Sequence, residues 1–183
     1  MKINYKNIKY VIKLLRINKQ MSMNELATEL GTHKTTIARL EKGEKIVSYK
    51  ELNDYSSFFH VPIIYIICNE EINLDTTKNI KYIKEKERIF ENQKLIMLDE
   101  NKISKKIIEK YKTYLKDNKK TTLESKKIIE ELAFNMFEES KGNIDIRRVT
   151  RRIKKEYIPF KYLDDFISVL DINIEEFFYI DIS

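Results

Sequence analysis

The sequence SMNELATELGTHKTTIARLEKG, residues 22–43, predicts two short helices joined by a tight turn. Ser22 and Glu25 have the spacing of a capping box, in which each side chain accepts a hydrogen bond from the other residue's backbone amide. Apolar residues follow at helical spacing, Leu26, Ala27 and Leu30 in the first helix and Ile37 and Leu40 in the second. Gly31 and Gly43 stand where each helix should end, because glycine adopts the left-handed conformation of a helix terminus without a steric penalty.

The flanking residues extend this pattern to a unit of five helices over residues 1–68. Residues 4–18 carry apolar side chains at helical spacing and predict a helix before the two short ones. Ser48 and Glu51 form a second capping box, and Val61-Pro62 should begin a last short helix. We also expect the small Ala27 and Gly31 to let the two short helices cross closely.

Eight positions of this unit form a recognisable pattern: Ser22, Glu25, Leu26, Ala27, Gly31, Ile37, Glu41 and Gly43. The pattern resembles the helix-turn-helix of the lambda-repressor-like, XRE-type family of transcriptional regulators. The resemblance implies that the helix over about 33–42 lies in the major groove of double-stranded DNA, while the preceding helix crosses the phosphate backbone. It implies a sequence-specific transcriptional regulator, with repression as the expected mode.

The same resemblance assigns roles to single residues. The matching outward positions of the second short helix read bases in the family, which indicates Lys34, Thr35 and Arg39 here, with Thr36 at the edge. Phosphate contacts are expected from Ser22, Met23, His33, Lys42 and Lys45, with Met23 acting only through its backbone because the family usually has Gln there. Arg16 and Glu41 match a family salt bridge, so we expect them to stabilise the domain.

Composition supports an all-α, DNA-binding protein. The 183 residues include only three Gly and two Pro, fewer than sheets joined by tight turns require. Of the net charge of +6, residues 1–50 carry eleven Lys or Arg against four Asp or Glu. A basic N-terminal part on a near-neutral remainder indicates that this part meets a polyanion.

Several other classes of protein are not expected. One Cys and two His cannot form a disulfide framework or a closed zinc site, and they lack the spacing of a nucleophile and its base. Three scattered glycines cannot build a phosphate-cradling loop, so we expect neither an enzyme nor a cofactor nor a metal. No signal peptide or membrane span is visible, which predicts a cytoplasmic, nucleoid-associated protein without a membrane partner.

The remainder of the chain predicts a polar linker at 69–79 and a helical C-terminal domain at 80–183. Helices are expected over 78–97, 103–115, 123–139, 145–156 and 160–170. Residues 163–178, LDDFISVLDINIEEFF, align without gaps to residues 52–67, LNDYSSFFHVPIIYII. Glu131-Leu132-Ala133 also echoes Glu25-Leu26-Ala27, although the turn glycine and the final Glu-x-Gly are missing.

Two interpretations of this second half stay open. In one, residues 103–183 are a degenerate second helix-turn-helix-like domain that touches DNA through Arg147, Arg148, Arg151 and Arg152. In the other, they form an oligomerisation domain whose basic helix pairs with acidic residues such as Glu130, Glu131, Glu138 and Glu139.

The expected mechanism is a homodimer, held by the C-terminal helices, on an operator with two half-sites about one DNA turn apart. Other functions use the same domain. They are the DNA-binding antitoxin of a toxin–antitoxin pair, which also binds a protein partner, and a plasmid or phage maintenance protein. A pure protein-interaction module is a further alternative.

Overall fold

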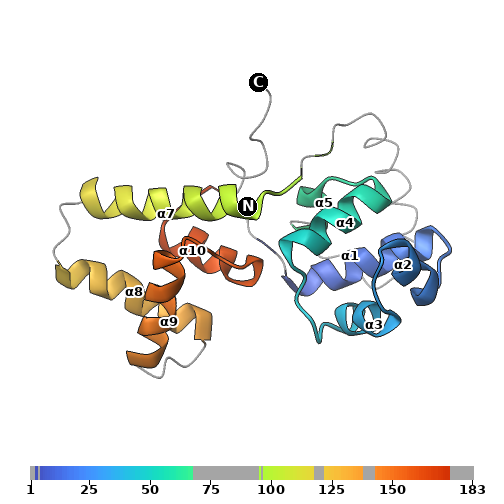
Figure 1. Ribbon diagram of the computed structural model, residues 1–183, viewed down its shortest axis with the longest axis horizontal. Helices are drawn as coiled ribbons and strands as arrows, with labels where there is room; N and C mark the ends of the chain where they lie inside the picture. Colours follow the sequence, from blue (N-terminus) through green and yellow to red (C-terminus); the bar gives the residue numbers. More distant parts are fainter. Residues whose placement is uncertain are drawn as a thin grey trace. The chain divides into compact units, whose positions relative to one another are not determined.

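The computed structural model describes residues 3, 5–67, 95, 97–117, 122–137 and 143–173. All regular structure among these residues is helical, which confirms the all-α prediction (Figure 1). The chain divides into two compact units, with the boundary between Leu98 and Asp99.

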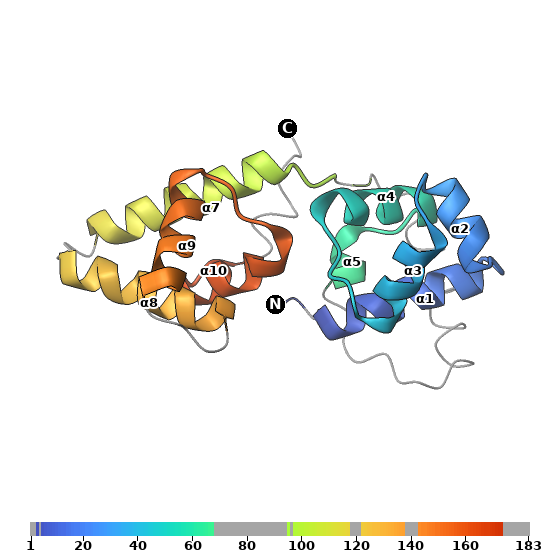
Figure 2. The same cartoon turned by 60° about the horizontal axis from the view of Figure 1, so that its bottom comes forward.

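The first unit contains five short helices: α1 (Tyr5–Asn18), α2 (Met23–Glu29), α3 (Lys34–Lys42), α4 (Tyr49–Phe59) and α5 (Ile63–Ile67) (Figures 1 and 2). Helix α3 packs against α1 and α2, and α5 packs against α1 and α4. Each helix contributes fully buried apolar side chains to one core, among them Leu15, Leu26, Ile37, Leu40, Leu52 and Ile66. Their helical spacing is what the sequence pattern required, because burying one apolar stripe per helix stabilises the unit.

The two turn glycines are needed for different reasons. Both have positive φ, +59° at Gly31 and +80° at Gly43, and end their helices in the left-handed conformation. A Cβ on Gly31 would meet nothing within 4 Å, so the expectation that this glycine permits a close helix crossing is wrong. A Cβ on Gly43 would lie 2.9 Å from Cδ of Lys9 on α1, so that position is constrained by space as well.

The first unit extends beyond the boundary predicted at residue 68. The side chain of Asn53 on α4 accepts from the Leu98 amide at 2.7 Å and donates to the Leu98 carbonyl at 2.8 Å, and Leu98 is buried. The predicted linker at 69–79 lies outside the described residues. So does the predicted helix over 78–97, except for residues 95 and 97, which are not helical.

The second unit contains α7 (Glu100–Asp117), α8 (Thr122–Phe137), α9 (Asn143–Lys154), the 3₁₀ turn η1 (Phe160–Tyr162) and α10 (Leu163–Val169). Helix α8 packs against α9 and α10 around the buried Leu132, Val149 and Phe166. Helix α7 begins earlier than the predicted residue 103 because Asp99 caps it, accepting from the amides of Asn101 and Lys102 at 2.9 and 3.0 Å.

The sequence repeat has a structural counterpart where α4 and α10 end. His60 and Asp171 take equivalent places, and both are left-handed, with φ of 54° and 50°. The residue that follows makes the same backbone hydrogen bond in each unit. The Val61 amide donates to the Ser56 carbonyl oxygen at 3.1 Å, and the Ile172 amide donates to the Ile167 carbonyl oxygen at 2.9 Å. Aligned positions are also buried in both units, at Leu52 and Leu163, Tyr55 and Phe166, and Phe59 and Leu170.

The likeness between the units is partial. Leu132 and Ala133 on α8 are buried, as Leu26 and Ala27 are on α2. However, α8 has 16 residues where α2 has seven, and α10 packs on α8 whereas α4 packs on α5. Residues 174–178 of the repeat lie outside the described residues. Among the described residues, the second unit thus follows the helix order of the first and packs α9 on α8 as α3 packs on α2, but its other helix contacts differ.

Candidate functional site

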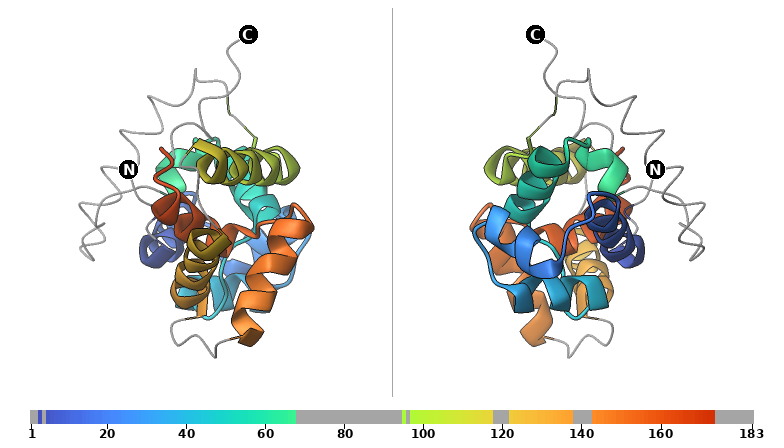
Figure 3. Two further views of the ribbon diagram at one scale, coloured as in Figure 1. Left: turned by 90° about the vertical axis from the view of Figure 1, so that its left-hand side faces the viewer. Right: turned by 90° about the vertical axis from the view of Figure 1, so that its right-hand side faces the viewer.

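Helix α3 presents a polar face outward from a rigid inner face. Ile37 and Leu40 point into the core, with 0% and 1% of their surface exposed. Lys34, Thr35 and Arg39, three of the four predicted base-reading residues, are exposed on the other side, and Thr36 is half-buried. The blue helices of this unit face the viewer in the right-hand panel of Figure 3. Three long or polar side chains on one exposed helix face can form hydrogen bonds with an external partner.

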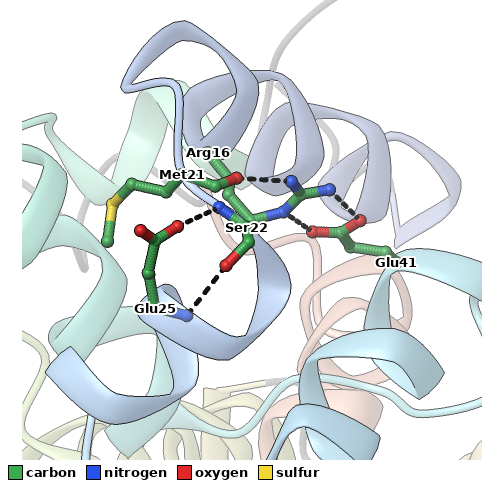
Figure 4. Close-up of polar contacts among 5 residues, drawn as sticks. All are labelled: Arg16, Met21, Ser22, Glu25 and Glu41. Carbon is green, nitrogen blue, oxygen red and sulfur yellow. Dashed lines mark hydrogen bonds and ion pairs between the residues drawn. The ribbon is translucent and has the colours of Figure 1, made fainter.

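Arg16 and Glu41 join α1 to the end of α3 (Figure 4). The guanidinium is bidentate, with Nε donating to Oε1 at 2.6 Å and Nη2 to Oε2 at 2.8 Å. Its third nitrogen, Nη1, donates to the carbonyl oxygen of Met21 at 2.7 Å. The side chains are only 10% and 3% exposed, and the hydrogen bonds from the guanidinium to Glu41 raise the pKa of Arg16. One side chain therefore fixes α1, the turn before α2, and α3 together.

The N-terminal end of α2 holds the predicted capping box (Figure 4). The Ser22 amide donates to the Glu25 carboxylate at 2.7 Å, and the Glu25 amide donates to the Ser22 hydroxyl oxygen at 3.2 Å. The hydrogen bond from the Ser22 backbone lowers the pKa of Glu25, so its carboxylate is ionised at neutral pH. Two amides are thus already used, which leaves the Ser22 hydroxyl hydrogen and the amides of Met23 and Asn24 as the groups that could meet a phosphate.

The loop after α3 contains an ion pair that the sequence did not reveal. Nζ of Lys45 contacts Oε1 of Glu51, and Glu51 also accepts from the Ser48 amide at 2.9 Å. Burial works to raise the pKa of Glu51, but the hydrogen bonds from Lys45 and Ser48 outweigh it and the pKa is lowered. Lys45 is therefore less available to an external anion than Lys42, which is exposed at the end of α3.

A depression lies between the turn before α3 and the loop after it. Thr32, Thr36, Lys45, Ser48 and Lys50 are among the residues that line it. The predicted residue Thr36 thus faces this depression as well as the outer side of α3. Lys50 was not singled out from the sequence, although a lysine two residues after the Ser48 cap was a usable signal. His33 is exposed as the N-cap of α3 and makes no capping hydrogen bond with its side chain.

The four arginines of α9 do not share one environment. Arg147 and Arg151 are exposed and make no ion pair with any described residue. Arg148 pairs with Asp145 at 3.2 Å, and the half-buried guanidinium of Arg152 lies 4.5 Å from the ring centroid of Tyr162. Of these four arginines, Arg147 and Arg151 are therefore the two that project from the helix without an ion pair or ring contact to the part of the unit that the structure describes.

Within one copy of the chain, the described acidic residues that were expected to pair with α9 form no ion pair with it. Glu130 pairs with Lys126 on its own helix at 3.7 Å, and Glu131 is exposed. Glu138 and Glu139 lie outside the described residues.

Other kinds of site were also sought. In the described ranges, no three His, Cys, Asp or Glu residues gather closely enough to hold a metal ion. None of the helices described is long and apolar enough to cross a membrane.

In a comparison with protein families, the family described as Helix-turn-helix matches residues 12–66, from within α1 to α5. No curated protein and no solved structure matches the chain significantly.

Proposed function

We propose, from the premise that residues 12–66 form a DNA-binding helix-turn-helix domain of the lambda-repressor-like, XRE type, that this chain is a sequence-specific transcriptional repressor. One observation carries the proposal. The outer face of α3 exposes Lys34, Thr35 and Arg39, while its inner face is held by the core and by the buried pair of Arg16 and Glu41. A helix fixed in this way can enter the major groove without rearranging.

The proposed base contacts follow from side-chain chemistry. Arg39 and Lys34 carry donors that suit O6 and N7 of guanine, and the methyl group of Thr35 suits the methyl group of thymine. Thr36 is half-buried beside the depression, so we assign it a contact at the edge of the site.

The proposed phosphate contacts surround this helix. Lys42 and His33 are exposed at its two ends, and the Ser22 hydroxyl and Met23 amide lie at the start of α2. Lys45 would have to exchange Glu51 for a phosphate, which makes it the weakest member of this set. Contacts to phosphate position a protein on the duplex without reading its sequence.

Repression would follow from occupancy of a promoter by a homodimer, whose two copies of α3 enter successive major grooves about one DNA turn apart. We propose that the C-terminal helices hold the dimer and that the protein acts on the nucleoid in the cytoplasm. A symmetric operator, together with a dimer mass in light scattering, would support this arrangement.

The test starts from a pool of random-sequence DNA duplexes selected on the full chain and then sequenced. On the selected duplex, Arg39→Ala should cost about 1–3 kcal/mol and relax the preference at one base pair. Lys42→Ala should weaken all sequences alike and reduce the salt dependence, whereas Lys13→Ala, at an exposed position of α1, serves as the matched control. An Arg39→Ala titration identical to that of the wild type would refute the assigned recognition face.

Two further measurements separate the proposal from its alternatives. A reporter gene behind the selected operator should be repressed by the chain, and activation would reverse the proposed sign. A small protein that co-purifies stoichiometrically and changes operator binding would instead favour the antitoxin function.

A further inference from the structure

The outer face of α9 is a second concentration of positive charge. Arg147, Arg151 and Lys154 are exposed on this helix at spacings of four and three residues, which place them on one side, and Lys155 follows directly. The helix carries five Lys or Arg residues and one acidic residue, Asp145. Asp145 is buried and pairs with Arg148, so it does not offset the charge of the outer face.

The inner side of α9 is anchored separately. Val149 is fully buried, and the guanidinium of Arg152 stacks on Tyr162. Nε of Arg152 is buried without a hydrogen-bond acceptor among the described residues. These contacts hold α9 to its unit and fix the direction in which Arg147 and Arg151 project.

Two residues of the outer face, Arg151 and Lys155, also border a hollow. It has a volume of ≈ 330 Å³ and is lined by Arg148, Arg151, Arg152, Lys155 and Tyr157. Four cations around one hollow repel each other, and Asp145 pairs with one of them, Arg148. An anion bound in the hollow would offset the repulsion between these cations, because opposite charges attract.

We infer that the face formed by Arg147, Arg151, Lys154 and Lys155 binds the phosphate backbone of the DNA duplex that α3 reads. The inference rests on the proposed function of the first unit. Asp99 follows Leu98 directly, so the two units are adjacent along the chain. Once the first unit is bound, the second basic face is held near the same duplex at a high effective concentration.

This face supplies affinity and not sequence preference. The second unit follows the helix order of the first, with α9 in the place of α3, but α9 lacks packing on α7 comparable to that of α3 on α1. Phosphate contacts need only exposed cations in a suitable row, whereas base contacts need a recognition helix held in a defined orientation. A degenerate copy of the domain can therefore keep the first capacity after losing the second.

The experiment measures binding of the full chain to the selected duplex as a function of salt. The variant Arg147→Gln/Arg151→Gln removes two charges from the face, and Lys126→Gln/Lys127→Gln removes two exposed charges from α8 in the same unit. Each lost phosphate contact should reduce the slope of log K against log salt by about 0.9, so the arginine variant should lose about 1.8. The corresponding loss of affinity is about 30-fold at about 0.15 M salt and about 4-fold at about 0.5 M.

A conservative variant guards against a merely structural effect. Arg147→Lys/Arg151→Lys keeps both charges and should keep the wild-type slope, because phosphate contact needs a cation and not a guanidinium. Both positions are exposed, so the far-ultraviolet circular dichroism and melting temperature of all three double variants should match those of the wild type. The base preference of the selected duplex should also be unchanged.

The outcomes separate this inference from the proposed function. If the wild-type chain binds and the arginine and lysine double variants have equal slopes, the second surface does not bind DNA while the first unit does. If Arg147→Gln/Arg151→Gln keeps the slope but dissociates an oligomer in sedimentation, the face binds a second copy of the chain, and the inference is overturned. If the wild-type chain binds no duplex at all, both proposals fail.

Discussion

Removal of the Arg16 guanidinium should be among the most destabilising single substitutions in the first unit. Arg16→Met keeps much of the aliphatic length but removes three hydrogen bonds of 2.6–2.8 Å to Glu41 and to the Met21 carbonyl. The Glu41 side chain is 3% exposed, so its carboxylate would stay buried without a counter-ion. Breaking one partner out of a buried ion pair typically costs about 3–5 kcal/mol, and we expect a value in this range.

The double variant Arg16→Met/Glu41→Leu tests the cause of that loss. With both charges replaced by apolar groups, the remaining defect is the Met21 carbonyl without its donor, which costs about 1 kcal/mol. We therefore expect the double variant to be more stable than Arg16→Met by about 2–4 kcal/mol. Lys126→Met breaks the exposed pair with Glu130 at 3.7 Å and should cost less than about 0.5 kcal/mol.

Hydrogen exchange at the amides of Ile37 and Leu40 reports the opening of the first unit alone, because both residues lie in its core. Urea unfolding of the whole chain provides a second measurement. A cost below about 1 kcal/mol for Arg16→Met, or a double variant as unstable as the single one, would refute the assignment of a buried, stabilising pair. Under conditions where Arg16→Met is folded, its preference among DNA sequences should change less than its stability does, because the buried Arg16 lies outside the exposed face of α3.

Three further outcomes follow from local geometry. Glu51→Gln should lower the free energy of unfolding by about 1 kcal/mol at neutral pH. Because the folded-state pKa of Glu51 is lowered, this difference from the wild type should disappear as the pH falls from 4.5 through the folded-state pKa. Urea unfolding midpoints at several pH values would measure it. Gly43→Ala should lower the melting temperature, because a residue with a Cβ in the left-handed conformation costs about 1–2 kcal/mol of stability and the new Cβ must also displace Lys9. Gly31→Asn should lower the melting temperature less, because the added Cβ would meet nothing within 4 Å. His60→Gly and Asp171→Gly should each stabilise the chain by about 0.5–1 kcal/mol, and a loss in either would contradict the equivalence of the two left-handed positions.

The fold of the first unit could be predicted because its determinants are local. Ser22 with Glu25, and Ser48 with Glu51, are complete within four residues, and each starts a helix where the pattern indicated. Gly43 likewise ends α3 because left-handed backbone is cheapest for glycine. Short-range signals of this kind do not depend on tertiary contacts, so they can be recognised from the sequence alone.

Features that depend on long side chains could not be predicted in the same way. Lys45 reaches Glu51 and Arg152 reaches the ring of Tyr162, and nothing in their spacing distinguishes them from solvated cations. The side chain of Asn53 forms a hydrogen bond with the backbone of Leu98, 45 positions away in sequence, and the spacing of apolar residues cannot predict such a contact. The four arginines of α9 were treated as equivalent in sequence, although Arg148 pairs with Asp145 three residues earlier on the same helix; the contact of Arg152 with Tyr162 is tertiary and could not be read from spacing.

The contact of Arg16 with three segments has a consequence for the kinetics of DNA binding. Since α1, the Met21 turn and α3 are tied to one guanidinium, α3, the proposed recognition helix, is preorganised before it meets DNA. Little conformational entropy is then lost on association, and a mismatched base is met by a surface that cannot relax to accommodate it. Discrimination should therefore appear mainly in how fast the complex dissociates from wrong sequences, while encounter with any duplex is governed by charge.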